Sequence, residues 1–207
     1  MLYRSGIGVG ASDDRANHYT LTSQCVASGG SGNTQIYTCT FPVYYYADAT
    51  DSGTYSSENW LCKITPSDHI GGGTGTTSSG IEMDTLKSID VGATISYGSL
   101  TPNHNTTGNH TVTVTNTGNI ATGFKVAGNN LGCSVRSSIP VGNQQYNLSS
   151  FSYGAGTALS VTATDVGANL NKPTQSTPTV TQNVYWQVAV PTGTKGTCTG
   201  STSFIIN

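Results

Sequence analysis

Apolar and polar residues alternate with a period of two along much of the chain, most clearly over residues 111–128. There Val112 and Val114 alternate with threonines, as in a strand with one buried face, and Phe124 and Val126 resume the alternation after the run NTGN. Asparagine and glycine tolerate the positive φ angles of a tight turn. The pattern therefore predicts a β-hairpin, and most of the chain repeats variations of it.

Further strands follow from the same alternation, and turn residues separate them. The segment at 81–88 is ambiguous and fits either an edge strand or one turn of helix. Strand–turn units of about 8–12 residues with almost no helical period are typical of β-sandwiches. We therefore expect an all-β fold with two β-sandwich domains, Ig-like or jelly-roll-like. The other strands are predicted at residues 18–27, 35–47, 57–65, 93–97, 146–153, 159–164, 180–190 and 202–206.

Domain boundaries are suggested by the run HIGGGTGTTSSG at residues 69–80, which has the composition of a linker. We expect an N-terminal arm at 1–12, a smaller sandwich at 13–80 and a larger one at 87–207. A single sandwich with a long insertion is the alternative.

Charge is scarce, because Asp, Glu, Lys and Arg make up 9% of the 207 residues, against about 25% in ordinary soluble domains. The formal net charge is −2 and the eight basic residues are scattered, which argues against a nucleic-acid partner. A net charge near zero favours association. The composition indicates an extracellular or assembled protein.

The five cysteines predict two disulfide bonds with one cysteine left over. The candidate bridges are Cys133–Cys198 together with either Cys39–Cys62 or Cys25–Cys39, and Cys25 stays unpaired in the first alternative. There is no C-x-x-C pair and no Cys/His spacing typical of zinc. The cysteines are therefore interpreted as structural.

Neither a membrane span nor a signal peptide is visible, since no run approaches the ~20 apolar residues of a span and MLYRSGIGVG lacks the regions of a leader. If the protein is secreted, we expect this chain to be the mature form. If Met1 is the initiator, an assembly made in the cytoplasm, such as a capsid, is favoured.

Two stretches carry a family resemblance. The run YYYADATDSGTY…NWLC resembles the immunoglobulin-like surface modules of archaea and candidate-phylum bacteria, and the second half, from IDVGATISYGSLTP to TGTKGTCTGSTSF, is similar to the module that follows them. The TNTGN run is also similar to camelysin-type biofilm fibre proteins. The resemblance covers about residues 37–207 and rests on turn and core residues. It implies secreted structural proteins of filament or S-layer type, here without an obvious anchor.

Chemistry-bearing residues are few. Three sequons, at Asn105, Asn109 and Asn147, are candidates for N-glycosylation. Asp48 and Asp51 lie in a turn-forming stretch that is not an EF-hand, so calcium is not expected. The four histidines are separated, and no G-x-S-x-G motif occurs. We predict no catalytic, cofactor-binding or metal-binding residue, and no enzymatic activity.

The run Tyr44-Tyr45-Tyr46 is a candidate aromatic surface, because alternate strand residues face opposite sides. Together with Trp60, the outward rings would stack on sugars or pack on a neighbouring subunit, unless both sides are covered within the domain. We expect Tyr45 on one side and the other two tyrosines on the opposite side.

Residues 1–12 have apolar points at Leu2, Ile7 and Val9 and no obvious hairpin partner. Such an arm can add as a strand to the next subunit by β-augmentation, and head-to-tail contacts that do not close build filaments. A frayed terminus is the alternative, and the C-terminal TSFIIN, expected to be a core strand, is the alternative donor.

The leading hypothesis is thus a pilus-like structural subunit of an extracellular filament or surface layer, which assembles with copies of itself by donor-strand complementation. A secreted adhesin or carbohydrate-binding module that binds surface glycans is the second hypothesis. A viral capsid or tail protein is the third.

Overall fold

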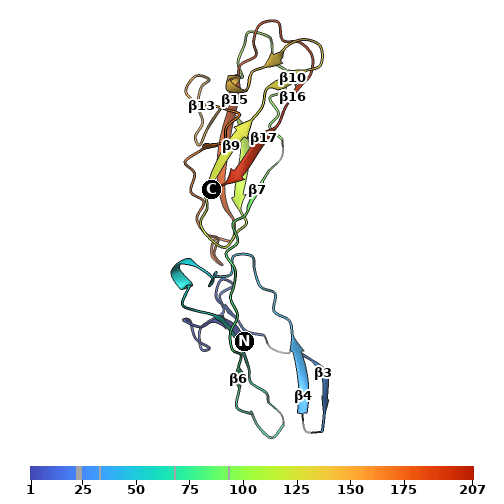
Figure 1. Cartoon of the computed structure of the whole chain (residues 1–207), viewed down its shortest axis with the longest axis vertical. Coiled ribbons are helices and arrows are strands. Elements are labelled where there is room, and N and C mark those ends of the chain that lie inside the picture. The colour runs from blue at the N-terminus through green and yellow to red at the C-terminus, as the bar shows by residue number, and fades with distance from the viewer. Residues whose placement is uncertain (22–24, 33, 68, 93) are drawn as a thin grey trace. The chain divides into compact units, whose positions relative to one another are not determined.

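A computed structural model describes residues 1–21, 25–32, 34–67, 69–92 and 94–207. The regular structure of these residues is β-strand apart from two three-residue 3-10 helices, η1 (Gly53–Tyr55) and η2 (Val141–Asn143). The paired strands are antiparallel (Figure 1), which confirms the all-β fold class. The chain divides into two compact units. Unit 1 comprises residues 1–86, 118–120 and 173–178, and unit 2 comprises 87–117, 121–172 and 179–207.

Unit 1 contains a four-stranded sheet in the order β2-β1-β5-β6, in which β1 is an inner strand. Leu2 of β1 is opposite Tyr19 of β2 on one side and Cys62 of β5 on the other. The core under this sheet is built from Tyr19, Ala47 and Trp60. Residues 2–4 are therefore paired within their own chain. The bounds are β1 (Leu2–Arg4), β2 (His18–Tyr19), β5 (Trp60–Ile64) and β6 (Thr76–Thr77).

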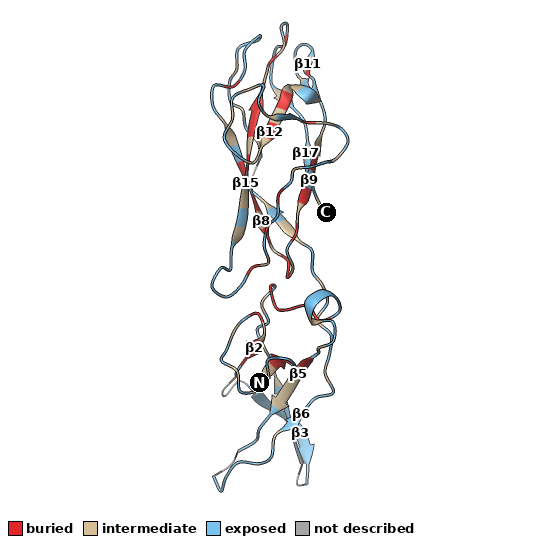
Figure 2. Cartoon of the chain, turned by 90° about the vertical axis from the view of Figure 1, so that its left-hand side faces the viewer, coloured by how far each residue is buried: buried red, intermediate tan, exposed pale blue. Residues whose placement is uncertain are grey.

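A separate two-stranded hairpin is formed by β3 (Cys25–Ser31) and β4 (Thr34–Cys39). A bulge between Ala27 and Gly29 shifts the register, and Gly29 and Gly30 lie within β3 at φ 153° and 137°, a conformation that favours glycine. Both glycines lie outside the strands predicted at 18–27 and 35–47, so the sequence did not place them in a strand. Residues 22–24 of the predicted strand 18–27 lie outside the described residues. Figure 2 shows β3 as exposed.

The predicted linker at 69–80 is folded into unit 1. Thr76 and Thr77 form β6 against Ile64 and Lys63, and Ile81 makes an isolated bridge with Trp60. The division between the units falls after Leu86. Glycine- and serine-rich sequence lacks a hydrophobic pattern, but backbone pairing with β5 does not require one.

Unit 2 is a sandwich of a five-stranded sheet, β13-β12-β15-β8-β7, and a three-stranded sheet, β14-β9-β17. Val114, Val184 and Trp186 of the first sheet and Phe124 and Val126 of the second are completely buried in one core. The bounds are β7 (Ile89–Val91), β8 (His110–Asn116), β9 (Phe124–Gly128), β12 (Gln144–Asn147), β13 (Thr157–Ala158), β14 (Thr164–Asp165), β15 (Val180–Val188) and β17 (Thr202–Ile206).

A third small sheet of unit 2 has the order β11-β10-β16, from β10 (Leu131–Cys133), β11 (Ser138–Ile139) and β16 (Cys198–Thr199). Ile139, Val188 and Val190 form a second buried cluster beside it, with Leu131 packed against them. None of these three short strands was predicted, because each is too short to show an alternation.

The predicted hairpin at 111–128 is wrong in its pairing. Both strands form, but β8 pairs with β15 and β7, whereas β9 pairs with β14 and β17. Residues 117–123 therefore cross from one sheet to the other. Val112, Val114, Phe124 and Val126 meet in the core between the sheets. A buried face on each strand is common to a hairpin and to two strands that face each other across a sandwich, so alternation does not distinguish them.

Candidate functional site: an edge cavity in unit 2

A cavity of about 1260 Å³ opens in unit 2 and is lined by residues 94–100, residues 194–202 and Phe204. Val112, Ile139 and Val188, which are buried in the sandwich, form part of its lining. We call it the edge cavity, because β17, the outer strand of its sheet, borders it. Its volume exceeds the roughly 300–1000 Å³ of ordinary small-molecule pockets.

The edge of β17 offers unpaired backbone groups. Asn207 donates its N–H to Gly123 O at 3.2 Å, and Ser201 O accepts from Asn129 N–H at 3.1 Å, so the odd-numbered residues face β9. Because backbone groups alternate along a strand, Thr202, Phe204 and Ile206 direct their N–H and C=O groups the other way. No backbone partner within the described residues reaches those groups. An edge of this kind is a template for another strand.

A second edge lies on β8, which β7 covers over only three residues. The last contact is Gly92 N–H to Thr113 O at 3.0 Å, so Thr111, two residues earlier on β8, has no β7 residue opposite it. Within the described residues the backbone of 94–101 makes no hydrogen bond to other backbone. The strand predicted at 93–97 is thus wrong over 94–97, and Ala93 lies outside the described residues. Ile95 and Tyr97 instead pack their side chains against the core.

Polar groups in the edge cavity are incompletely satisfied. Gln144 is 1% exposed, yet its Oε1 accepts from Tyr97 Oη at 3.4 Å and its Nε2 donates to Asn129 O at 3.3 Å; both bonds are long. Thr194 Oγ1 is buried and has no partner among the described residues. Burial raises the pKa of Tyr97. The cavity thus combines apolar surface with hydrogen-bonding groups that an extended polypeptide would complement.

The predicted donor residues occupy positions in unit 1. Leu2 packs against the unit 1 core, Ile7 is 36% exposed and Val9 is half-buried. Next to Leu2, Tyr3 is buried, and Arg4 makes a buried ion pair with Asp48 and a partly buried one with Glu58. Residues 1–4 would have to leave these contacts in order to donate a strand.

Most side chains of the predicted aromatic surface are buried or covered in the structure. Tyr45 and Tyr46 lie in a turn and not in a strand. Trp60 is completely buried and donates Nε1–H to Asp48 O at 2.8 Å, so its assignment to a surface is wrong. Tyr46 is buried, and Tyr44 lies under the guanidinium of Arg15, which is 4.5 Å from its ring centroid.

Tyr45 is the exposed member of the run, at 41%, and it donates its hydroxyl to Pro178 O at 2.6 Å. Desolvation and the neighbouring Tyr46 raise its pKa. A single exposed ring that is already hydrogen-bonded gives little support to a sugar-stacking platform.

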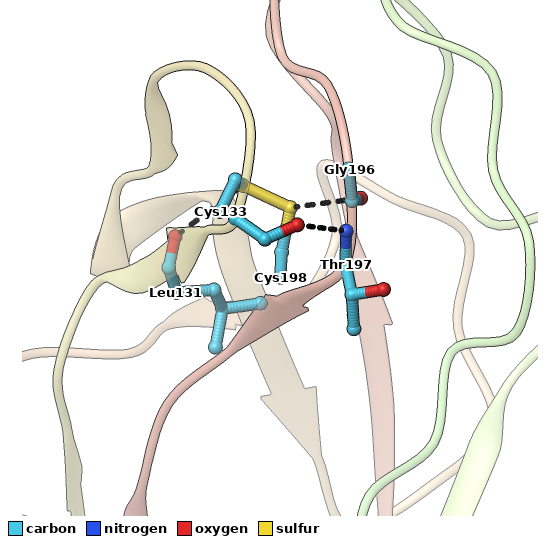
Figure 3. The surroundings of a disulfide bond; sticks show 6 residues. Leu131, Cys133, Gly196, Thr197 and Cys198 are labelled. Carbon is cyan, nitrogen blue, oxygen red and sulfur yellow. Dashed lines mark hydrogen bonds between the residues drawn. A yellow bond between two sulfur atoms is a disulfide. The ribbon is translucent and has the colours of Figure 1, made fainter.

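The cysteines form two disulfides. Cys133–Cys198 links β10 to β16 (Figure 3), and Cys25–Cys39 links the ends of β3 and β4. Of the two alternatives for Cys39, the structure has the bridge to Cys25. The Cys39–Cys62 alternative does not form, and Cys62 is the free, half-buried cysteine.

The three sequons differ in their surroundings. Asn105 is exposed. Asn109 is half-buried, and its amide donates to Ser150 Oγ at 2.8 Å while accepting from Phe151 N–H at 3.3 Å. Asn147 is half-buried in β12 and accepts from Ser149 N–H. Asn105 is therefore the sequon whose side chain is free for modification.

The acidic turn residues have other partners. Asp48 is buried against Arg4. Asp51 is exposed and accepts from Thr85 Oγ1 at 2.7 Å, a hydrogen bond that lowers its pKa. No group of three or more His, Cys, Asp or Glu residues is placed to hold a metal ion in the described part of the chain.

Neither helix among the described residues is long and apolar enough to span a membrane. Comparison of the chain with protein-family models, with curated proteins and with solved structures gives no match.

The sequence did not predict the edge cavity, although the apolar C-terminal run and the segment at 93–97 were both predicted to be strands.

Proposed function

We propose that this protein is a structural subunit of an extracellular filament or surface layer, and that copies of it assemble by adding an extended segment of one copy to β17 of the next. The observation that carries the proposal is the unpaired edge of β17 beside the edge cavity. Main-chain hydrogen bonds along such an edge supply affinity, and side chains that enter the cavity supply specificity. Contacts of this head-to-tail kind build open polymers when they do not close.

The chemical character of the chain supports an extracellular setting. Two disulfides are typical of oxidising compartments. With 9% charged residues and a net charge of −2, copies repel one another little. The disulfides support the extracellular setting, and the low charge fits an assembled protein better than a freely dissolved monomer.

A substitution in β17, the strand that accepts the added segment, gives a sharper test than deletion of the N-terminal arm. Deletion of residues 1–12 would remove β1, an inner strand, together with the buried Arg4. Loss of assembly would then be confused with loss of folding in unit 1. A change at the free edge of β17 avoids this problem.

Thr202→Pro removes an outward N–H and blocks the edge, whereas Thr202→Val, the matched control, keeps the backbone donor. We expect electron microscopy and light scattering to show polymers for the native chain and for Thr202→Val, and monomers for Thr202→Pro. Circular dichroism should show all three to be folded. Monodisperse native protein, or unchanged polymers of Thr202→Pro, would overturn the proposal.

A further inference from the structure

The β3–β4 hairpin is an element without a partner in the described chain. Its two strands form a sheet of their own, and all seven residues of β3 are exposed. An isolated two-stranded hairpin is at best marginally stable in water. Here the Cys25–Cys39 bridge holds the two strand ends together. The hairpin therefore presents exposed, disulfide-linked strands that no other sheet of the described chain covers.

Apolar side chains lie on both faces of this hairpin. Residues directly opposite each other share a face, so Val26 lies with Thr38, and Tyr37 lies with Ala27 on the other face. Ile36, next to Tyr37 on β4, returns to the face of Val26. Val26, Ile36 and Tyr37 are 70%, 55% and 53% exposed. A hairpin that lies flat on a surface covers one face only, whereas one inserted between two layers covers both.

The β3–β4 hairpin and the edge cavity have two properties in common: they carry almost no charged residues, and their strand edges are unprotected. Residues 25–39 contain no Asp, Glu, Lys or Arg, and Lys195 is the one such residue among the described residues that line the cavity. Burial of an unpaired charge is costly, and insertion of the hairpin into the cavity would bury almost none. Natural edge strands are usually protected by lysine or proline. Neither residues 25–39 nor β17 has either residue.

We propose that the β3–β4 hairpin of one copy inserts into the edge cavity of a second copy, with β4 paired along the free edge of β17. β4 is the pairing strand because β3 is interrupted by its bulge and its glycines. Residues 94–101, which no backbone hydrogen bond holds within the described chain, yield to the incoming strand. This inference rests on the proposed function and names the segment that fills its site.

The test combines one variant on each side of the contact. Ile36→Asp places a charge on the hairpin, and Thr202→Pro blocks β17. Val161→Asp is the control, because Val161 is also an exposed β-branched residue, at 72% against 55% for Ile36, and it lies outside both elements. We expect Ile36→Asp and Thr202→Pro each to sediment as monomers, and Val161→Asp to form polymers like the native chain. Unchanged thermal unfolding of Ile36→Asp will show that the variant is folded.

Mixing the two monomeric variants is the decisive step. Ile36→Asp keeps an intact cavity and Thr202→Pro keeps an intact hairpin, so one contact can form and no second one can follow. We expect a heterodimer of twice the monomer mass in analytical ultracentrifugation. Hydrogen exchange on native polymers should show protection at residues 25–39 and 202–206 together. Monomers alone in the mixture would overturn the inference.

The outcomes also separate the two proposals. If Thr202→Pro abolishes assembly while Ile36→Asp polymerises normally, strand addition at β17 stands and the hairpin is not the donor. If Ile36→Asp abolishes assembly and Thr202→Pro does not, the hairpin binds elsewhere and the edge cavity is overturned as the acceptor. If the native chain is monodisperse, both proposals fail.

Discussion

Arg4 and Asp48 form a buried ion pair, with Nε 3.0 Å from Oδ2 and each side chain 6% exposed. The pair connects β1 to the stretch that follows the tyrosine run. Glu58, whose side chain is 20% exposed, accepts from the same guanidinium. The backbone carbonyl of Asp48 also receives the indole N–H of Trp60. Asp48 therefore joins the first strand, through its side chain on Arg4, to the core tryptophan, through its backbone carbonyl.

Arg4→Met should strongly destabilise unit 1, because it removes the guanidinium that pairs with the buried Asp48 carboxylate and with Glu58. Removal of one member of a buried ion pair typically costs about 3–5 kcal/mol. The double variant Arg4→Met/Asp48→Leu should recover part of this loss, since the buried Asp48 carboxylate is then removed and the carboxylate that loses Arg4 is that of Glu58, whose side chain is 20% exposed. Urea unfolding followed by circular dichroism gives both free energies. A loss below about 1 kcal/mol in the single variant would contradict the prediction.

The two tryptophans differ in their hydrogen bonding. Trp60 and Trp186 are both completely buried. Trp60 donates its indole N–H, whereas Trp186 Nε1 has no partner among the described residues. Replacement by Phe removes the same volume at each site, but only Trp60→Phe breaks a hydrogen bond. We expect Trp60→Phe to cost about 1 kcal/mol more than Trp186→Phe in denaturant titrations. Equal losses would show that this bond contributes nothing measurable.

The two disulfides should differ in what their removal affects. The Cys133–Cys198 bridge joins two positions of unit 2 that are 65 residues apart in sequence, and chain entropy alone gives it about 4 kcal/mol. The Cys25–Cys39 bridge closes 14 residues in the exposed hairpin. Cys133→Ser/Cys198→Ser should therefore markedly lower the unfolding temperature of unit 2. Cys25→Ser/Cys39→Ser should leave the main transitions in calorimetry almost unchanged, and a large shift there would show that the hairpin is coupled to a core.

The sequence predicted strands best where alternating residues are buried. β17 has the predicted bounds, and β15 ends two residues before the predicted 190. Alternation reports which face of a strand is buried and says nothing about its partner, so β8 and β9 were taken as a hairpin. The tyrosine run was taken as a strand, since aromatic residues favour strands in general. Tyr46 is instead buried from a turn, through packing that no local pattern encodes.

The edge cavity lay beyond what the sequence could predict. Ile95 and Tyr97 have the spacing of a strand, and their side chains do reach the core. Their backbone nevertheless does not continue the pairing of β7 with β8, which ends at Gly92 and Thr113. That outcome depends on the surrounding sheets and not on residues 94–97. The candidate site is thus a property of the topology, which places two incompletely paired strands beside one opening.

The sequons at Asn105 and Asn109 should respond differently to substitution. The Asn109 side chain bridges Ser150 and Phe151, so Asn109→Gln should cost about 1–3 kcal/mol through displaced hydrogen bonds. Asn105 is exposed, and Asn105→Gln should be neutral. In native material, glycopeptide mass spectrometry should find any glycan at Asn105 before Asn109. A glycan on Asn109 in folded protein would contradict the bonding described for its amide.

Tyr97 predicts a loss of stability at alkaline pH. Burial raises its pKa above the ordinary value of about 10. A tyrosine whose folded pKa is raised contributes stability that is fully present below pH 10. That contribution is lost as the pH rises toward the folded pKa, because the unfolded chain releases the proton first. The slope is at most about 1.4 kcal/mol per pH unit for one group.

The matched variant is Tyr97→Phe, which keeps the ring against His110, 5.3 Å away between centroids, and removes the titrating hydroxyl. Burial also raises the pKa values of Tyr146 and Tyr153 in unit 2, so the native chain should weaken above pH 10 even without Tyr97. The difference in unfolding free energy between the native chain and Tyr97→Phe isolates the contribution of Tyr97. We expect that difference to be constant below pH 10 and to fall above it. A difference that stays constant up to pH 11 would mean that the Tyr97 hydroxyl is open to solvent and that the edge cavity is wetter than its lining indicates.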